Sequence, residues 1–356
     1  MHTLEDLGWS PHFEQQLSGR DPDGLLPARI AEELKGAYRI YVDGRLLPAV
    51  LLGKMLHTAT GRDDLPATGD WVLARPLPGE DRALVVELLE RRTRLSRKEA
   101  GERTGEQLLA ANVDIVILVA SLNHELNLRR IERYLTAIWE SGAGPVIALN
   151  KADLAEEAAG LLVEVQGIAP GVPVHVTSAA TGEGVESLAS HLGAGVTAVF
   201  VGSSGVGKSS LINRIIGSEA QTVAAIREDD KGRHTTTSRQ MLVIPGRGVI
   251  IDTPGLRELQ LWTNESGASM TFSDVEVIAR GCRFNDCTHE REPGCAVRAA
   301  LEAERLDEDR VRSYRKLERE RMYIARKHDQ MLQIEEKKRW KQIHKDYRQR
   351  LRIRGR

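Results

Sequence analysis

The chain has 356 residues, of which 28% are charged and 41% hydrophobic, and its formal net charge is −1. At roughly 150 residues per domain, this length predicts two or three domains. No apolar run approaches the ~18 residues of a membrane span, and the N-terminal sequence lacks a basic-then-apolar signal, so a membrane or secreted protein is not expected. An odd count of three cysteines argues against a disulfide framework, and a reducing cytoplasm is the expected location.

Short apolar runs separated by turns occupy residues 37–89 and predict a small β-barrel. An OB fold fits this pattern, and OB folds often bind oligonucleotides, but the strands alone do not distinguish it from an SH3-like barrel. Basic residues at 91–98 follow, before a Gly-containing linker at 100–105. This basic stretch could contact RNA or could be a solvated linker.

A near-continuous apolar run at 113–120 is typical of a parallel strand that is buried on both faces. Apolar residues at helical spacing follow between Leu128 and Ile138 and predict a helix that covers the sheet. Strands and helices alternate from here to Asp252, which predicts a doubly wound α/β sheet. After Gly255 the sequence becomes mostly helical and, over 302–338, densely charged.

A candidate base-recognition motif ends the next predicted strand, at residues 145–149. Ligands of open α/β sheets bind at that end of the strands. The carboxylate of Asp153 only accepts hydrogen bonds, so it can pair with the ring N–H and the exocyclic amine of guanine, whereas adenine would leave it unpaired. Lys151 can lay its stem along the base; a helix N-cap is the alternative interpretation. The motif consists of Asn150, Lys151, Ala152 and Asp153.

A second turn with a predicted role at the base follows the strand-like run at 172–176. Thr177, Ser178 and Ala179 occupy this turn. Their backbone N–H groups could bind the guanine carbonyl, and Ser178 and Ala179 are the predicted nucleotide contacts.

The phosphate-binding pattern G-x-x-x-x-G-K-[ST] lies between a predicted strand at 196–201 and a predicted helix at 208–216. Its glycines let successive N–H groups point at phosphates beside the positive end of the helix. Lys208 would reach the terminal phosphates, and the hydroxyl of Ser209 would hold Mg²⁺. A Gly-rich turn without a ligand is the alternative, which the flanking elements disfavour. The predicted contacts are Gly202, Ser203, Ser204, Gly205, Val206, Gly207, Lys208, Ser209 and Ser210.

Two further segments predict contacts with Mg²⁺ and the γ-phosphate. Asp252 ends a strand-like run at 248–251 and can reach Mg²⁺ through water, while the amide of Gly255 can meet the γ-phosphate. A threonine triplet within residues 232–237 should complete the Mg²⁺ shell. Thr235 and Thr236 are the two candidates, and the sequence does not decide between them.

One residue departs from the pattern that many GTPases use for hydrolysis. A Gln that orients the attacking water often follows the glycine of the D-x-x-G motif, but Leu256 stands there and cannot hydrogen-bond to water. Slow unassisted hydrolysis is therefore expected. His234 is the internal candidate to orient or deprotonate water, and a solvated loop histidine is the equally weighted alternative.

All three cysteines of the chain lie in one short segment that also contains a histidine. Three thiolates and one imidazole form the ligand set of a closed structural zinc site, with no open position for catalysis. Inert cysteines beside a loop histidine are the alternative, which the clustering among glycines and a proline disfavours. The predicted ligands are Cys282, Cys287, His289 and Cys295.

The base motif precedes the phosphate loop, which is the reverse of the usual order in GTPases. With the G-R-H-T-T-T segment at 232–237, the D-T-P-G segment at 252–255 and the Cys-x4-Cys-x-His-x5-Cys set, this order resembles the RsgA (also called YjeQ) family of bacterial GTPases. The resemblance runs through nearly the whole chain. It implies an N-terminal OB-type barrel, a circularly permuted GTPase domain and a C-terminal zinc-containing helical domain. The expected domains are 1–100, 101–263 and 264–356.

The resemblance also implies a function in late maturation of the small ribosomal subunit, with rRNA binding and GTP hydrolysis that the subunit stimulates. GTP or GDP with Mg²⁺ and a structural zinc ion are the expected ligands, and a monomer is the expected state. Residues 337–356 contain ten Lys or Arg and one acidic residue, a basic arm suited to RNA phosphates. A non-catalytic RNA-binding scaffold that holds GTP as a structural ligand is the alternative function.

Overall fold

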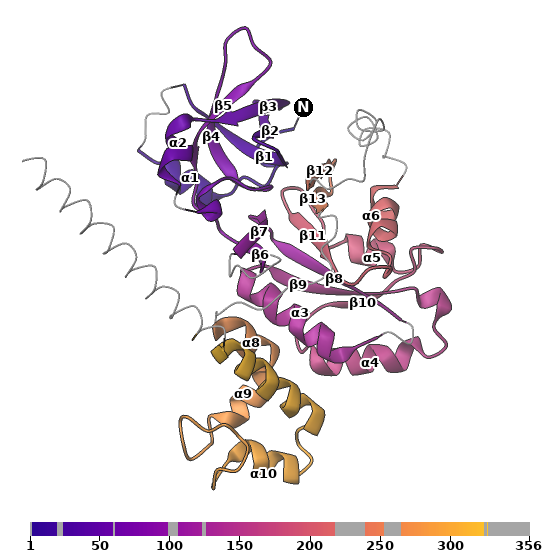
Figure 1. Ribbon diagram of the computed structural model, residues 1–356. Helices are drawn as coiled ribbons and strands as arrows, with labels where there is room; N and C mark the ends of the chain where they lie inside the picture. The colour runs from indigo at the N-terminus through magenta and orange to yellow at the C-terminus, as the bar shows by residue number, and fades with distance from the viewer. Residues whose placement is uncertain are drawn as a thin grey trace, which may run out of the picture. The chain divides into compact units, whose positions relative to one another are not determined.

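The computed structural model describes residues 2–19, 24–59, 61–98, 106–122, 126–217, 239–252, 265–323 and 326 (Figure 1). The chain forms two compact units, Met1–Gln260 and Leu261–Arg356. The predicted boundary near residue 100, between barrel and GTPase domain, lies inside the first unit and remains a prediction. No helix in the described ranges is both long and apolar enough to span a bilayer.

The N-terminal strands close into a five-stranded barrel with the order β1-β2-β3-β5-β4, in which β4 returns to β1. The pair β3–β5 is parallel and the other four pairs are antiparallel. This is the closed Greek-key arrangement of an OB-type fold, so it decides the alternative that the sequence left open. The strands are β1 (Leu26–Leu34), β2 (Ala37–Val42), β3 (Arg45–Leu51), β4 (Trp71–Pro76) and β5 (Ala83–Leu88), with α2 (Gly53–Thr58) and η1 (Arg62–Asp64) between β3 and β4.

Alternate residues of the barrel strands point inward and fill the barrel. Ile30, Ile40, Val72 and Val85 are fully buried in this core. A register shift after Ile30 bends β1, which pairs with β2 on one side and with β4 on the other.

The second part of this unit is a sheet with the order β10-β9-β8-β11-β13-β12. The first five strands are parallel and β12 is antiparallel to β13, as predicted for a doubly wound fold. The strands are β8 (Ile115–Ser121), β9 (Gly144–Asn150), β10 (Val174–Val176), β11 (Thr197–Val201), β12 (Gln240–Ile244) and β13 (Gly248–Asp252).

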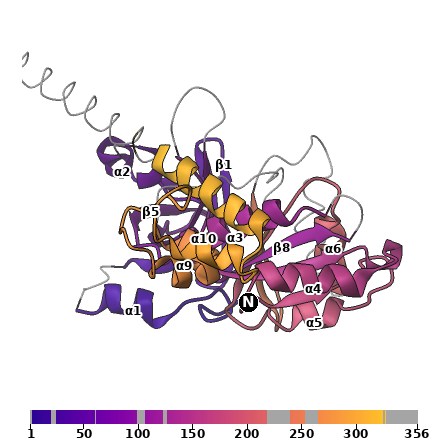
Figure 2. The same cartoon turned by 90° about the horizontal axis from the view of Figure 1, so that it is seen from below.

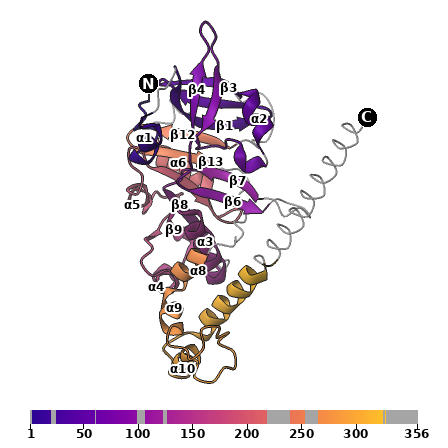
Figure 3. The same ribbon diagram turned by 90° about the vertical axis from the view of Figure 1, so that its left-hand side faces the viewer.

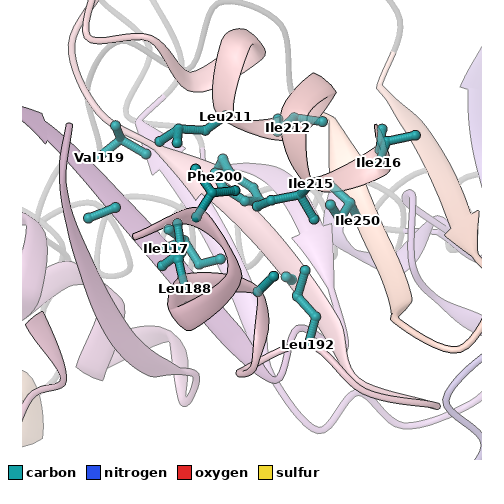
Figure 4. Close-up of a cluster of buried hydrophobic side chains, with 14 of the residues drawn as sticks. Ile117, Val119, Leu188, Leu192, Phe200, Leu211, Ile212, Ile215, Ile216 and Ile250 are labelled. Atoms are coloured by element: carbon teal, nitrogen blue, oxygen red, sulfur yellow. The ribbon is translucent and has the colours of Figure 1, made fainter. Parts of the chain in front are cut away.

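Helices cover both faces of this sheet (Figures 1 and 2). On one face α3 and α4 pack together, and on the other α5 and α6 do. Leu188 of α5 and Ile212 of α6 pack over Ile117, Phe200 and Ile250 of the strands (Figure 4). The helices are α3 (Leu128–Ser141), α4 (Ala158–Ile168), α5 (Val185–Ala189) and α6 (Lys208–Ile216), with the 3-10 turn η2 (Ala152–Leu154) after β9.

The barrel and the α/β sheet are joined within this unit. Strand β12 pairs with β1 through Gln240 and Glu32, so both parts belong to one continuous sheet (Figure 3). The short ladder β6 (Arg94–Lys98) and β7 (Glu106–Ala111) links them along the chain.

The N-terminal segment with α1 (Pro11–Leu17) packs against the barrel. The rings of Trp9 and Trp71 lie 4.8 Å apart, and Phe13 is buried beside them.

The second unit is helical in its described residues. Helices α8 (Glu265–Thr271), α9 (Ser273–Ala279) and α10 (Ala296–Glu302) precede a helix over 308–323. Arg310 of that helix donates to both carboxylate oxygens of Asp274 and lies over the ring of Phe272, at 4.8 Å from its centroid. This contact ties the last helix to α9 around a small core.

Candidate nucleotide and zinc sites

The three predicted nucleotide motifs follow three parallel strands at the same edge of the sheet. Asn150 is the last residue of β9, Gly202 follows β11, and Asp252 is the last residue of β13. Carboxyl ends of neighbouring parallel strands form the ligand-binding edge of α/β sheets. The fold therefore brings together motifs that lie far apart, and in reversed order, along the chain.

The side chain of Asn150 links the two predicted base-recognition turns to the phosphate loop. It is 1% exposed, and its Nδ2 donates to the carbonyl of Val206 in the phosphate loop at 2.8 Å. Its Oδ1 accepts from the backbone N–H of Ala179 at 3.0 Å and from the hydroxyl of Thr177 at 3.4 Å. The base-recognition turn and the phosphate loop are thus held at one fixed separation by a single amide.

Asp153 lies beside the second base-recognition turn. The hydroxyl of Ser178 donates to Asp153 Oδ1 at 2.5 Å, and Ser178 is fully buried while Asp153 is exposed. Lys151, which follows Asn150 in the motif, adopts a left-handed backbone with φ of 67°, which turns the chain sharply after β9. The carboxylate is oriented by a neighbour and accessible, as hydrogen bonding to a base requires.

Two glycines of the phosphate loop, Gly202 and Gly207, stand where a side chain could not fit. A Cβ at Gly207 would lie 2.2 Å from Asn150 Nδ2, and one at Gly202 would lie 2.2 Å from the carbonyl of Val119. Both residues have positive φ, at 95° and 140°. Lys208 Nζ donates to the carbonyls of Gly202 and Ser203 at 2.8 and 2.7 Å, so its ammonium lies across the loop.

The remaining predicted contacts are placed as follows. Val206 is buried, whereas Ser204, Gly205, Ser209 and Ser210 are exposed at the loop and the first turn of α6. Exposed backbone N–H groups at a helix N-terminus can bind phosphate. An exposed hydroxyl there can supply an oxygen ligand to Mg²⁺. Four predicted residues lie outside the described part of the chain: His234, Thr235, Thr236 and Gly255.

The four predicted zinc ligands converge in the second unit, with all ligand atoms within 4.8 Å of one another. His289 Nδ1 lies 3.5 Å from the sulfur atoms of both Cys282 and Cys295, which are 3.9 Å apart. Tetrahedral coordination with Zn–S of ~2.3 Å and Zn–N of ~2.0 Å requires edges of about 3.8 and 3.5 Å. The distances among Cys282, His289 and Cys295 match these edges, and Cys287, within 4.8 Å of the others, can supply the fourth ligand after a small shift.

The surroundings favour the metal-binding forms of two of these residues. Burial, and then the charge of Arg315, lower the pKa of His289, so its imidazole is neutral. Burial alone would oppose ionisation of the Cys282 thiol, but backbone N–H groups of Val297 and Ala296, together with hydrogen bonds from Cys295 and Cys287, lower its pKa. These N–H groups belong to the first turn of α10, whose positive end stabilises a thiolate.

Comparison with known proteins agrees with this geometry. The family profile described as RsgA GTPase matches residues 88–262. A protein from Opitutus terrae named small ribosomal subunit biogenesis GTPase RsgA is 46% identical over 99% of each chain. The chain belongs to the RsgA GTPase family.

Solved structures of similar proteins show the same fold as this RsgA family member. The crystal structure of YjeQ from Thermotoga maritima superposes with a TM-score of 0.64 at 27% identity, over 84% of this chain and 99% of that one. YloQ, described as a circularly permuted GTPase, superposes with a TM-score of 0.62 at 23% identity, over 85% and 97%. The permuted order predicted from the motifs is confirmed as a property of the fold.

Two side-chain contacts at the candidate site were not predicted from the sequence. Thr177 was predicted to contribute a backbone N–H, but its side chain also donates to Asn150. Arg130, in the first turn of α3, donates to the hydroxyl of Ser203 at 2.9 Å. In the sequence, a lone arginine in an exposed helix turn cannot be distinguished from an arginine that contacts only solvent.

Proposed function

We propose that this chain hydrolyses GTP to GDP and phosphate in late maturation of the small ribosomal subunit, at a site formed by the permuted motifs. The observation that carries the proposal is the pair of contacts from Asn150 to Val206 and to Ala179. These contacts support the proposal because they link the turn predicted for guanine to the loop predicted for phosphates through one buried amide. A single purine nucleotide can span that arrangement.

The proposed roles follow from the chemistry of each side chain. Asp153, held by Ser178, accepts hydrogen bonds from the guanine ring N–H and amine, and Lys151 packs its stem on the base. Lys208 and the loop N–H groups bind the phosphates. The guanine carbonyl is assigned to a backbone N–H of the second base turn, from Ser178 or Ala179. Either group would exchange its present acceptor, Glu183 for Ser178 or Asn150 for Ala179, for the base.

Mg²⁺ and the attacking water are assigned to residues at the phosphate end. The hydroxyl of Ser209 and, through water, Asp252 would hold the ion, which neutralises charge that develops on the phosphates during hydrolysis. Thr235 or Thr236 completes the shell, and Gly255 binds the γ-phosphate. His234 orients or deprotonates the water, because Leu256 offers no hydrogen bond.

The cluster of Cys282, Cys287, His289 and Cys295 is proposed as a structural zinc site. Its four protein ligands leave no coordination position for a substrate. In a unit whose described core is small, the ion would contribute directly to folding.

The proposed partner is the small ribosomal subunit and its rRNA, bound by a cytoplasmic monomer. Relatives at 45–46% identity are named small ribosomal subunit biogenesis GTPases. The OB-type barrel and the basic residues at 337–356 supply chemistry suited to RNA. Because Asp252 to Gly255 leads directly into the second unit along the sequence, we infer that the γ-phosphate controls affinity for the subunit.

Turnover of GTP by the full chain, measured with small subunits, with large subunits and alone, tests this function. Small subunits should raise turnover selectively, and affinity for them should be higher with a GTP analogue than with GDP. Equal affinities would contradict the nucleotide control, because a ligand without differential affinity shifts no equilibrium. A non-catalytic scaffold would show no turnover under any of the three conditions.

A further inference from the structure

Arg130 is a second cation at the phosphate loop, in addition to Lys208. Its NH1 donates to Ser203 Oγ at 2.9 Å. Ser203 is the second residue of the loop, and Arg130 lies 73 positions earlier in the sequence. The permuted order places this arginine upstream of the loop, on the helix that follows β8.

The position of Arg130 is fixed by its helix. Asn127 caps α3, and its side-chain oxygen accepts the backbone N–H of Arg130 at 3.0 Å. The buried face of the helix, including Ile131, Leu135 and Ile138, anchors α3 on the sheet. A capped and anchored first turn therefore holds the Arg130 backbone at a constant distance from the loop.

Among the residues that the structure describes, no carboxylate pairs with Arg130. Its neighbour Arg129 forms an ion pair with buried Glu132, at 2.8 Å. Within the described part of the chain, the interactions of Arg130 are its cap and its contact with Ser203. A guanidinium next to a phosphate loop raises the local positive potential for a polyanion.

Two cations converge on Ser203, one from each side. Arg130 holds its hydroxyl, and the Lys208 ammonium donates to its carbonyl at 2.7 Å. Displacing Ser203 would therefore move an acceptor that directs the Lys208 ammonium. Arg130 can affect the phosphates through this chain of contacts without touching them.

The junction between α3 and the loop is lined by polar as well as apolar side chains. A cavity of about 30 Å³, large enough for one water molecule, lies between Ser121, Asn127, Arg130, Ser203 and Val206. The Ser121 hydroxyl faces no hydrogen-bond partner among the described residues although the residue is only 4% exposed. Polar groups of α3, β8 and the loop meet here around a space that water can enter.

We propose that Arg130 is a positioning residue for the phosphate loop: through Ser203 it fixes the Lys208 ammonium and so strengthens binding of the triphosphate over the diphosphate. The proposal rests on the nucleotide site assigned above. It predicts a selective effect on the terminal phosphate, because Lys208 is the group that reaches it. Global stability should not depend on Arg130, since its side chain is exposed.

The test measures affinities of the full chain for GDP and for a non-hydrolysable GTP analogue by calorimetry, together with thermal unfolding. Arg130→Met keeps the aliphatic stem and removes charge and donors. We expect roughly two- to tenfold weaker analogue binding, the range of one net hydrogen bond, with GDP affinity less affected. Arg130→Lys should recover part of the loss. Arg247→Met, which removes an exposed arginine paired with Glu186 in the same unit, is the matched control and should change neither affinity.

A double-mutant cycle shows whether the effect passes through Ser203. Ser203→Ala and Arg130→Met should each weaken analogue binding, and the double variant should be no weaker than the worse single one. Unchanged analogue affinity in Arg130→Met, fully additive losses, or equal losses for GDP and the analogue would each overturn the proposal. Lys208→Ala distinguishes failure of the nucleotide site from failure of the positioning role. Nucleotide binding that survives Lys208→Ala would refute the nucleotide site. Loss of binding in Lys208→Ala, together with normal binding in Arg130→Met, would refute only the positioning role.

Discussion

Replacing Arg29 with Met should destabilise the first unit strongly. Arg29 is 1% exposed at the place where the N-terminal segment, the barrel and the α/β sheet meet. Its guanidinium donates to the carbonyls of Leu7, Gly69 and Asn112, and it lies 5.4 Å from the ring centroid of Trp71. Burial lowers the pKa of Arg29 to about 10, partly opposed by Asp114, so the side chain is still charged at neutral pH.

The expected magnitude follows from the carbonyls that would lose their donor. Gly69 keeps a hydrogen bond from Asn112 Nδ2, at 3.2 Å, but the carbonyls of Leu7 and Asn112 each lose the bond from Arg29. An unsatisfied buried acceptor costs about 1–3 kcal/mol. Removal of the charge of Arg29 also removes the cost of burying it, which offsets part of this destabilisation. We therefore expect a loss of about 3–4 kcal/mol in the free energy of unfolding.

Denaturant unfolding followed by tryptophan fluorescence measures this loss directly, because Trp9 and Trp71 lie next to the substituted side chain. Arg29→Lys, which keeps the charge but lacks the planar fork, should lose less and provides a second variant if Arg29→Met does not fold. Arg247→Met breaks an exposed pair with Glu186 and should cost less than about 1 kcal/mol. An Arg29→Met protein within about 1 kcal/mol of the parent would refute the reasoning, since one such buried acceptor alone costs that much.

Two further predictions concern protonation and metal binding. Burial, and then the charge of His191, lower the pKa of His175 below 6.5, so its contribution to stability is complete above pH 6.5 and is lost as the pH falls through the lowered value. The decline in unfolding free energy between about pH 7 and 5 should therefore be shallower in His175→Gln, and parallel curves for the two proteins would contradict this. We expect metal analysis to find zinc in the parent and none in Cys282→Ser. The second unit of this variant should be unfolded, as judged by circular dichroism and protease sensitivity. A variant that retains stoichiometric zinc would show that the cluster is not the site.

Local signals in the sequence predicted the elements around the phosphate loop accurately. The apolar run before Gly202 forms β11, and the predicted helix at 208–216 is α6 with the same bounds. These elements are determined by features only a few residues apart, namely the apolar run, the glycines and the residues that begin the helix. The convergence of Asp153 with Ser178 also followed from sequence, because both come directly after strands of one parallel sheet.

Pairing between distant strands could not be predicted in the same way. The choice of an OB-type barrel depends on the parallel pair β3–β5 and on the return of β4 to β1. Strand β1 itself was not among the predicted runs, since Arg29, Glu32 and Glu33 interrupt its apolar pattern. Two of these charges, Arg29 and Glu32, are buried by contacts with other elements. Such burial is a property of the tertiary structure.

The central claim is that Asp153 and Lys208 bind the two ends of one nucleotide. Xanthine has a carbonyl where guanine has its exocyclic amine, and the amide of Asn offers one acceptor and donors, which suit xanthine. The Asp153→Asn variant should bind GTP about 100-fold more weakly or worse, because two bonds to a charged acceptor are lost. The same variant should bind and hydrolyse XTP. Adding Lys208→Ala should then abolish XTP binding as well. GTP affinity that is unchanged in Asp153→Asn, or XTP binding that survives the loss of Lys208, would contradict the claim.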